Sequence, residues 1–221
     1  SRREVARLFI SPAPEDIIQH LLSEGKITTE QAEMARMVPV ADDITVEADS
    51  GGHTDNRPLV CMMPGMIALR NELQAEYDYK TPVRIGAAGG ISTPEAALAA
   101  FMMGAAFITT GSVNQACVEA ATSEHTRKLL AEASMADVIM APSADMFEMG
   151  VRVQVLKRGT LFPMRAQKLY ELYTGYPNWE AVPEEERAKL EKTIFRRSYA
   201  EVWEGTKQFF EERDPRPVSY T

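Results

Sequence analysis

The chain has few cysteines and histidines and no long apolar run, and each scarcity excludes a class of protein. It contains 2 cysteines and 3 histidines in 221 residues. Cys61 and Cys117 have no metal-ligand spacing, so we expect two reduced, buried thiols and no metal site built on them. No apolar run approaches the roughly 20 residues that span a bilayer, and the first residues lack a signal-peptide pattern. These absences favour a cytoplasmic protein.

An excess of positive charge is also missing. The 24 Lys and Arg are outnumbered by 32 Asp and Glu, which gives a formal net charge of −8. Such a chain has no general affinity for nucleic acid or for an anionic membrane surface. Its hydrophobic content of 45% is sufficient for a sizeable core. The composition is therefore that of a globular enzyme-like chain with one or two domains.

Two glycine-rich turns carry the strongest functional signal. The first follows an apolar strand expected at 83–87 and contains Ala88, Gly89 and Gly90. The second follows a strand expected at 105–109 and contains Gly111 and Ser112. Glycine lets a backbone approach an anion closely, and free N–H groups at a helix start supply hydrogen bonds and positive dipole. The pattern predicts a phosphate site at the top of a (β/α)8 barrel, with flavin mononucleotide (FMN) as the first candidate ligand.

The order of elements supports a parallel sheet or barrel. Strands expected at 44–48, 83–87 and 105–109 alternate with helical segments, and amphipathic helices follow at 163–173, 183–196 and 198–212. Thr28 with Gln31 has the spacing of a capping box inside a helical hairpin at 14–37. The segment 136–142 fits either a strand or a buried connection. Because a complete barrel takes roughly 250 residues, we expect only its C-terminal part at 1–150, followed by a helical extension at 151–221.

A Gly-Gly-His turn follows the strand at 44–48. Gly51 and Gly52 at this position favour a closely approaching ligand, although a tight turn with an incidental histidine is the alternative. The His53 imidazole could hydrogen-bond a substrate carbonyl, donate a proton or remove one. The neighbouring Asn56 and Arg57 could contact flavin or substrate phosphate. The carboxylates of Asp49 and Asp55 could simply cap and solvate the loop. The spacing of the two aspartates matches no known metal site, so we expect no metal.

Several segments resemble a known family. Asp49-Ser-Gly-Gly-His-Thr-Asp-Asn-Arg-Pro58, the turn at 86–93 and Thr110-Gly-Ser112 resemble flavin-dependent enoyl reductases related to nitronate monooxygenase and 2-nitropropane dioxygenase. The segments 141–148 and 153–163 are similar to the PfaD-type subfamily, the trans-acting enoyl reductases of polyunsaturated fatty acid synthases and some polyketide synthases. The resemblance covers essentially the whole chain. The first half of the family's barrel has no counterpart in this sequence.

The resemblance implies a mechanism. It implies noncovalently bound FMN, NADPH as reductant, and an α,β-unsaturated thioester on acyl carrier protein as the hydride acceptor. His53 would polarise the thioester oxygen or supply the proton to the α-carbon. Gly51, Gly52, Ala88, Gly89, Gly90, Gly111 and Ser112 would line the cofactor site. A nitronate monooxygenase-like oxidase, another phosphate-binding barrel enzyme and a non-catalytic assembly module remain the alternatives.

A run of basic residues could form a surface that contacts the carrier protein. Because carrier proteins are acidic, docking needs a local basic surface, and the chain from Gly150 to Lys168 contains cations and no acid. These cations are Arg152, Lys157, Arg158, Arg165 and Lys168. They either contact the carrier protein or its phosphopantetheine phosphate, or form a solvated basic face. The resemblance also implies a wider synthase complex as a partner. A half barrel also leaves strand edges exposed, so a homo-oligomer is open as well.

Overall fold

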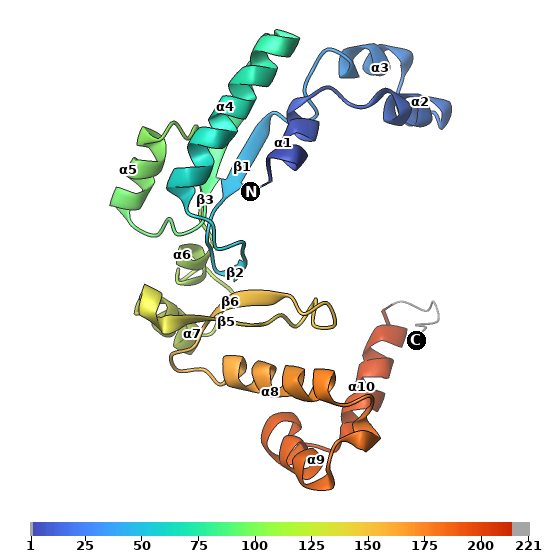
Figure 1. Cartoon of the computed structure of the whole chain (residues 1–221), viewed down its shortest axis with the longest axis vertical. Coiled ribbons are helices and arrows are strands. Elements are labelled where there is room, and N and C mark those ends of the chain that lie inside the picture. Colours follow the sequence, from blue (N-terminus) through green and yellow to red (C-terminus); the bar gives the residue numbers. More distant parts are fainter. Residues whose placement is uncertain (1, 214–221) are drawn as a thin grey trace. The chain divides into compact units, whose positions relative to one another are not determined.

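The computed structural model describes residues 2–213 and divides the chain into two compact units (Figure 1). The first unit contains the residues up to 140 together with 152–160, and the second contains 141–151 together with the residues from 161 onward. The boundary predicted from the sequence lies at residue 150. In the structure the chain leaves the first unit after residue 140, returns at 152 and leaves again after 160.

The first unit is built on a three-stranded parallel sheet. Its strands are β1 (Asp43–Glu47), β3 (Arg84–Ala88) and β4 (Ile108–Thr109), in the order β1-β3-β4. Two crossover helices make the strands parallel: α4 (Leu59–Tyr77) joins β1 to β3, and α5 (Pro94–Met102) joins β3 to β4. The parallel arrangement that the sequence predicts is confirmed.

The third strand is shorter than the predicted segment 105–109. Its ladder covers Ile108 and Thr109, although Ala106 N–H already donates to the Ile85 carbonyl at 2.8 Å. A side chain on Gly86 would overlap the Phe107 ring, so this strand can approach β3 only because residue 86 is glycine.

The core of the first unit lies between α4 and the parallel sheet. Met63, Met66, Leu69 and Leu73 recur at helical spacing along α4 and are buried. They pack with strand residues that include Val46, Ile85 and Ala87, and Figure 1 shows α4 alongside β1 and β3. The packing of α4 on the sheet holds the parallel strands in place, so that they end at the same edge of the sheet.

Three shorter helices precede the sheet. Helix α1 (Arg3–Ile10) packs on α4, and the buried Tyr79 hydroxyl donates to the Ile10 carbonyl at 2.8 Å. Helices α2 (Glu15–Ser23) and α3 (Thr29–Ala35) form the predicted hairpin. The capping box of Thr28 and Gln31 is confirmed, with reciprocal hydrogen bonds of 2.8 and 3.1 Å.

A second, small sheet has the strand order β2-β6-β5. Its members are β2 (Gly52–His53), β6 (Arg152–Leu156) and β5 (Val138–Pro142), and β2 is antiparallel to β6. The segment 136–142, which the sequence leaves open between a strand and a connection, is therefore largely a strand. Between β4 and β5 lie α6 (Ser112–Gln115), α7 (Glu124–Ala131) and a 3-10 turn, η1 (Met135–Asp137).

The second unit is mainly helical. It contains α8 (Phe162–Gly175), η2 (Trp179–Ala181), α9 (Glu184–Leu190), a π-helical turn η3 (Glu191–Phe195) and α10 (Tyr199–Glu211). The three helices predicted here are confirmed, except that the one predicted at 183–196 changes from α to π geometry after Leu190. The rings of Trp179 and Tyr199 stack with centroids 4.4 Å apart. Within residues 2–213, no helix has the length and apolar content needed to cross a membrane.

Candidate functional site

The three glycine turns meet where β1, β3 and β4 end. The position that a Cβ atom on Gly51 would occupy lies 2.9 Å from Ser112 Oγ, and the corresponding position on Gly89 lies 2.7 Å from the Ala48 carbonyl oxygen. The Ala48 N–H also donates to the Ala88 carbonyl at 2.9 Å. The turns after all three parallel strands are thus in direct contact within the first unit.

The turn after β3 has a backbone that glycine alone adopts easily. Gly89 and Gly90 both have positive φ, 92° and 69°. Helix α5 then begins with Thr93 as its N-cap, whose hydroxyl accepts from Ala96 N–H at 3.2 Å. Thr93, rather than the neighbouring Ser92, is therefore the residue that caps this helix.

Free donors remain at these turns. Within residues 2–213, the backbone N–H groups of Gly89, Gly90 and Ser112 have no hydrogen-bond acceptor. The space around the Cβ position of Gly111 is open. Donors without acceptors beside backbone that carries no side chain are suited to an anionic group such as a phosphate.

The turn after β4 is held by a residue that the sequence did not single out. The Asn114 side chain donates to the Thr110 carbonyl at 2.8 Å and accepts from the Thr110 hydroxyl at 3.0 Å. This pair closes the turn around Gly111 and Ser112. The i, i+4 spacing of a threonine and an asparagine across a Gly-Ser pair is the signal that could have found it.

His53 lies on β2 with an exposed side chain. It is placed opposite Val153 of β6, one residue along from the pair of Gly52 with Gln154. The half-buried Asp49 carboxylate accepts hydrogen bonds from the Thr54 hydroxyl at 3.0 Å and from Gln154 Nε2 at 3.2 Å. Asp49 therefore organises the loop that carries His53.

Two further polar residues of that loop, Asn56 and Arg57, form hydrogen bonds through their backbone. Asn56 has a positive φ of 54°, and its N–H donates to the Thr54 hydroxyl at 3.1 Å. The Arg57 carbonyl accepts from Asp49 N–H at 2.8 Å. No group of three or more His, Cys, Asp or Glu side chains able to hold a metal occurs in the described part of the chain.

The five cations proposed for docking are divided between the two units. Arg152, Lys157 and Arg158 belong to the first unit, and Arg165 and Lys168 to the second. Intramolecular carboxylates lie near three of them: Arg158 is 3.6 Å from Glu132 and 3.8 Å from Asp137, Lys157 interacts electrostatically with Asp137, and Lys168 is 2.6 Å from Glu186. The hydrogen bond that Lys168 donates to the Glu186 carboxylate raises the pKa of Lys168. Arg152 and Arg165 donate to the carbonyls of Met140 and Thr193.

The prediction of buried thiols is wrong. Cys61 and Cys117 are both free and exposed. Cys61 lies on α4 two residues before Met63, the first buried residue of the core-facing stripe, and at about 100° per residue that offset turns its side chain away from the stripe. Cys117 lies just after the four-residue helix α6, in a stretch without regular structure.

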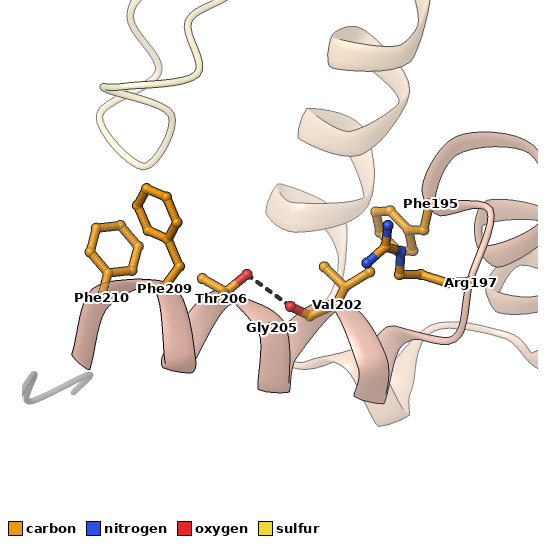
Figure 2. A pocket seen from close by; sticks show the side chains of 7 residues that line it. All are labelled: Phe195, Arg197, Val202, Gly205, Thr206, Phe209 and Phe210. Atoms are coloured by element: carbon orange, nitrogen blue, oxygen red, sulfur yellow. Dashed lines mark hydrogen bonds between the residues drawn. The ribbon is translucent and has the colours of Figure 1, made fainter. Parts of the chain in front are cut away.

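A hollow of about 600 Å³ lies on the second unit, along α10 (Figure 2). Apolar side chains dominate its lining, which consists of Phe195, Arg197, Val202, Gly205, Thr206, Phe209 and Phe210. The Thr206 hydroxyl is turned back to donate to the Val202 carbonyl at 2.8 Å. None of the site residues predicted from the sequence lines this hollow.

Known proteins resemble the chain along nearly its whole length. A component of the polyunsaturated fatty acid synthase of Thraustochytrium sp. is 56% identical over 212 residues, which are 95% of this chain and 14% of the relative. "Polyketide biosynthesis protein PksE" of Bacillus subtilis is 53% identical over 203 residues, 92% of this chain and 26% of the relative. The chain thus spans only a small part of the curated relatives that it matches.

A solved structure extends the comparison to the fold. The enoyl reductase domain of MlnA, from the macrolactin biosynthesis cluster of Bacillus amyloliquefaciens, is 43% identical with a TM-score of 0.88, over 97% of this chain and 47% of that domain. The family model of the [acyl-carrier-protein] S-malonyltransferase inserted helical domain matches residues 176–220. The chain is therefore a mixed α/β polypeptide with the fold of nearly half of an enoyl reductase domain.

Proposed function

We propose that the chain is part of an FMN-dependent enoyl reductase that reduces α,β-unsaturated acyl thioesters carried on acyl carrier protein. The observation that carries the proposal is the 43% identity and TM-score of 0.88 to the MlnA enoyl reductase domain over 97% of the chain. The names of the curated relatives support a place in polyunsaturated fatty acid or polyketide synthesis. We include in this proposal that the chain forms part of a (β/α)8 barrel and that the protein is cytoplasmic.

The residues present fit the phosphate of FMN. The N–H groups of Gly89, Gly90 and Ser112 are donors without acceptors within residues 2–213, and Gly111 leaves open space beside them. Ala88 ends the strand that delivers this turn, and Gly51 lies against Ser112 from the other side. When bound, FMN would supply the hydride for the β-carbon, with NADPH as its reductant.

His53 would carry the proton chemistry. Reduction of the double bond needs one hydride at the β-carbon and one proton at the α-carbon, while negative charge develops on the thioester oxygen. An exposed imidazole on β2, next to Gly51 and Gly52, is suited to donate a hydrogen bond to that oxygen or to deliver the proton. The protein would thereby supply orientation and electrostatic stabilisation to a reaction whose redox step belongs to the cofactor.

The carrier protein would meet a basic surface in the first unit. Lys157 and Arg158 are exposed and adjacent, at the end of β6. Arg158 lies near both Glu132 and Asp137, whereas Lys157 interacts with Asp137, so Lys157 would contribute more to attraction of an acidic partner. A homo-oligomer remains a further expectation from the sequence.

The test is flavin retention followed by turnover. The purified chain is incubated with FMN, desalted and examined by visible absorbance. We expect a retained flavin spectrum, bleaching of that spectrum by NADPH without oxygen, and its return on addition of a short enoyl thioester. Retained flavin that oxidises nitroalkanes with oxygen and ignores enoyl thioesters would overturn the proposal in favour of a nitronate monooxygenase-like oxidase. A colourless chain that binds carrier protein would favour an assembly module.

A further inference from the structure

The strand that carries His53 is too short to hold its own register. Strand β2 consists of Gly52 and His53, and only two residue pairs join it to β6. Strand β2 lies at the edge of the small sheet, and two pairs form too short a ladder to fix its register firmly. Because side chains alternate between the faces of a strand, a slip of one residue would move the imidazole to the other face of the small sheet. Something other than the ladder must fix this register.

A hydrogen-bonded clamp lies beside the strand. Gln154 Nε2 of β6 donates to Asp49 Oδ1 at 3.2 Å, across 105 positions of sequence. The same carboxylate oxygen accepts from the Thr54 hydroxyl at 3.0 Å, and that hydroxyl accepts from Ser50 N–H at 3.3 Å. The clamp therefore binds the residues on both sides of β2 to each other and to β6. The side chains of Asp49, Thr54 and Gln154 are all half-buried, which shields these bonds from competing water.

The clamp acts from the face opposite the imidazole. Gln154 pairs with Gly52 and Val153 pairs with His53. Directly opposed residues in an antiparallel pair share a face, and their chain neighbours share the other one. Gln154 and His53 thus belong to opposite faces. The glutamine can therefore hold the strand through Asp49 without lying on the face of the imidazole.

We propose that Gln154 is a positioning residue, which fixes the register of β2 through the Asp49 carboxylate and thereby places His53 at the edge where the glycine turns meet. The consequence for turnover rests on the function proposed above, whereas the consequence for β2 does not. Gln154 lies in the segment 153–163 that resembles the PfaD-type subfamily, but that resemblance gives it no role. Only the contact with Asp49 assigns it a role.

Amide exchange and cross-strand NOEs of the isotope-labelled chain test whether Gln154 fixes the register of β2. Gln154→Leu removes the amide and retains a side chain of similar size. We expect exchange of the β2 amide that donates across the ladder, either that of Gly52 or that of His53, to accelerate by about tenfold, the factor that one hydrogen bond to a charged group represents. We also expect the His53–Val153 NOE to weaken. The matched control is Gln19→Leu, which breaks another glutamine–carboxylate bond, 2.7 Å to Glu15, in the same unit. It should leave β2 unchanged.

Gln154→Glu separates positioning from packing. Near neutral pH its carboxylate faces Asp49 and repels it, so β2 should loosen as in Gln154→Leu. At lower pH the protonated glutamic acid donates to Asp49, and slow exchange should return. The other titratable groups of the loop, Glu47, His53 and Asp55, are present in both variants, so the leucine variant subtracts their effects. If Gln154→Leu fails to fold, the parent chain serves as the reference instead, because it contains the same three groups.

The rate of enoyl-thioester reduction tests whether the position of β2 matters for catalysis. In both variants at neutral pH we expect kcat for enoyl-thioester reduction to fall about tenfold with KM unchanged, and the glutamate variant should recover as pH falls. Unchanged exchange of the β2 ladder amide in Gln154→Leu would overturn the inference. So would lost register with unchanged kcat. If the parent chain reduces no enoyl thioester, the proposed function fails, and the exchange experiment alone decides the role of Gln154.

Discussion

The Cβ position of Gly51 and the Oγ atom of Ser112 are 2.9 Å apart, so the turn after β1 touches the turn after β4. The turn after β3 joins them, because the Cβ position of Gly89 is 2.7 Å from the Ala48 carbonyl oxygen. Absence of side chains is what allows three turns to meet at this edge. The same glycines therefore serve both the packing of the edge and the site proposed for a phosphate.

Gly89→Ala should destabilise the chain by about 1–3 kcal/mol, because residue 89 has a φ of 92° and an added methyl would strike backbone atoms that cannot rotate away. Urea unfolding measures the effect. Gly111→Ala is the matched control, since its φ is −119° and nothing lies within 4 Å of its Cβ position. It should change stability by less than about 0.5 kcal/mol. Equal losses in both variants would contradict the backbone explanation.

Gly86→Ala should destabilise the parallel sheet by about 1–3 kcal/mol, because its methyl group would overlap the Phe107 ring. Phe107→Leu in the same chain removes the edge of that ring. The double variant should therefore be more stable than the sum of the two single losses predicts, and thermal unfolding of all four proteins gives the coupling. Additive losses would mean that the two residues do not compete for the same space.

Local sequence signals predicted the parallel sheet well. Alternation of apolar strands with helical segments predicted the bounds of β1 and β3 to within one residue, because β3 is largely buried and α4 carries a stripe of core side chains. The capping box of Thr28 and Gln31 was equally local. Such features depend on neighbours in sequence, which a single chain displays directly.

The parts that escaped prediction depend on contacts between distant residues. Strand β2 has only two residues and exists because β6, about a hundred residues later, pairs with it. Gln154 lies in a segment that resembles the family, yet nothing in the sequence indicates its contact with Asp49. The exposure of Cys117 follows from an irregular segment after a four-residue helix, which no periodicity marks.

His53→Gln should lower kcat for enoyl-thioester reduction by about 10²–10⁴-fold, the usual contribution of a positioned acid. Glutamine can still donate a hydrogen bond, but it cannot deliver a proton. Flavin retention should be unchanged, since the proposed phosphate donors are backbone groups of other turns. Stopped-flow reoxidation of the reduced flavin by substrate measures the step directly. His125→Gln, at an exposed position on α7, is the control. Unaltered reoxidation in the His53 variant would remove the histidine from the mechanism.

Charge reversal of Lys157 and Arg158 to glutamate should raise KM for a carrier-bound substrate and leave KM for a short thioester unchanged, because only the carrier protein brings a large acidic surface. Added salt should reduce the difference between parent and variant. Lys128→Glu is the control, since Lys128 is also exposed in the first unit and lies 2.8 Å from Glu124. Equal effects on both substrates would show that the two cations do not serve docking.

The α2–α3 hairpin should become less stable in acid, because the Glu15 carboxylate becomes protonated. Arg36 Nε and Nη2 donate to the two oxygens of Glu15 at 2.9 and 2.6 Å, and these bonds lower the pKa of Glu15 from 4.5 to about 2. A lowered pKa in the folded state means that the contact stabilises the hairpin above pH 4.5 and is lost as pH falls toward 2.

Methyl NMR of the buried Ile18 on α2 reports this loosening of the hairpin. We expect a constant Ile18 signal from pH 7 to about 4.5 and a change between 4.5 and 2. Both side chains are partly exposed, so salt should diminish the effect. Glu15→Gln should already be looser at pH 7 and should lack the change between 4.5 and 2. The same transition in that variant would assign it to another carboxylate, such as Glu33, which also contacts Arg36.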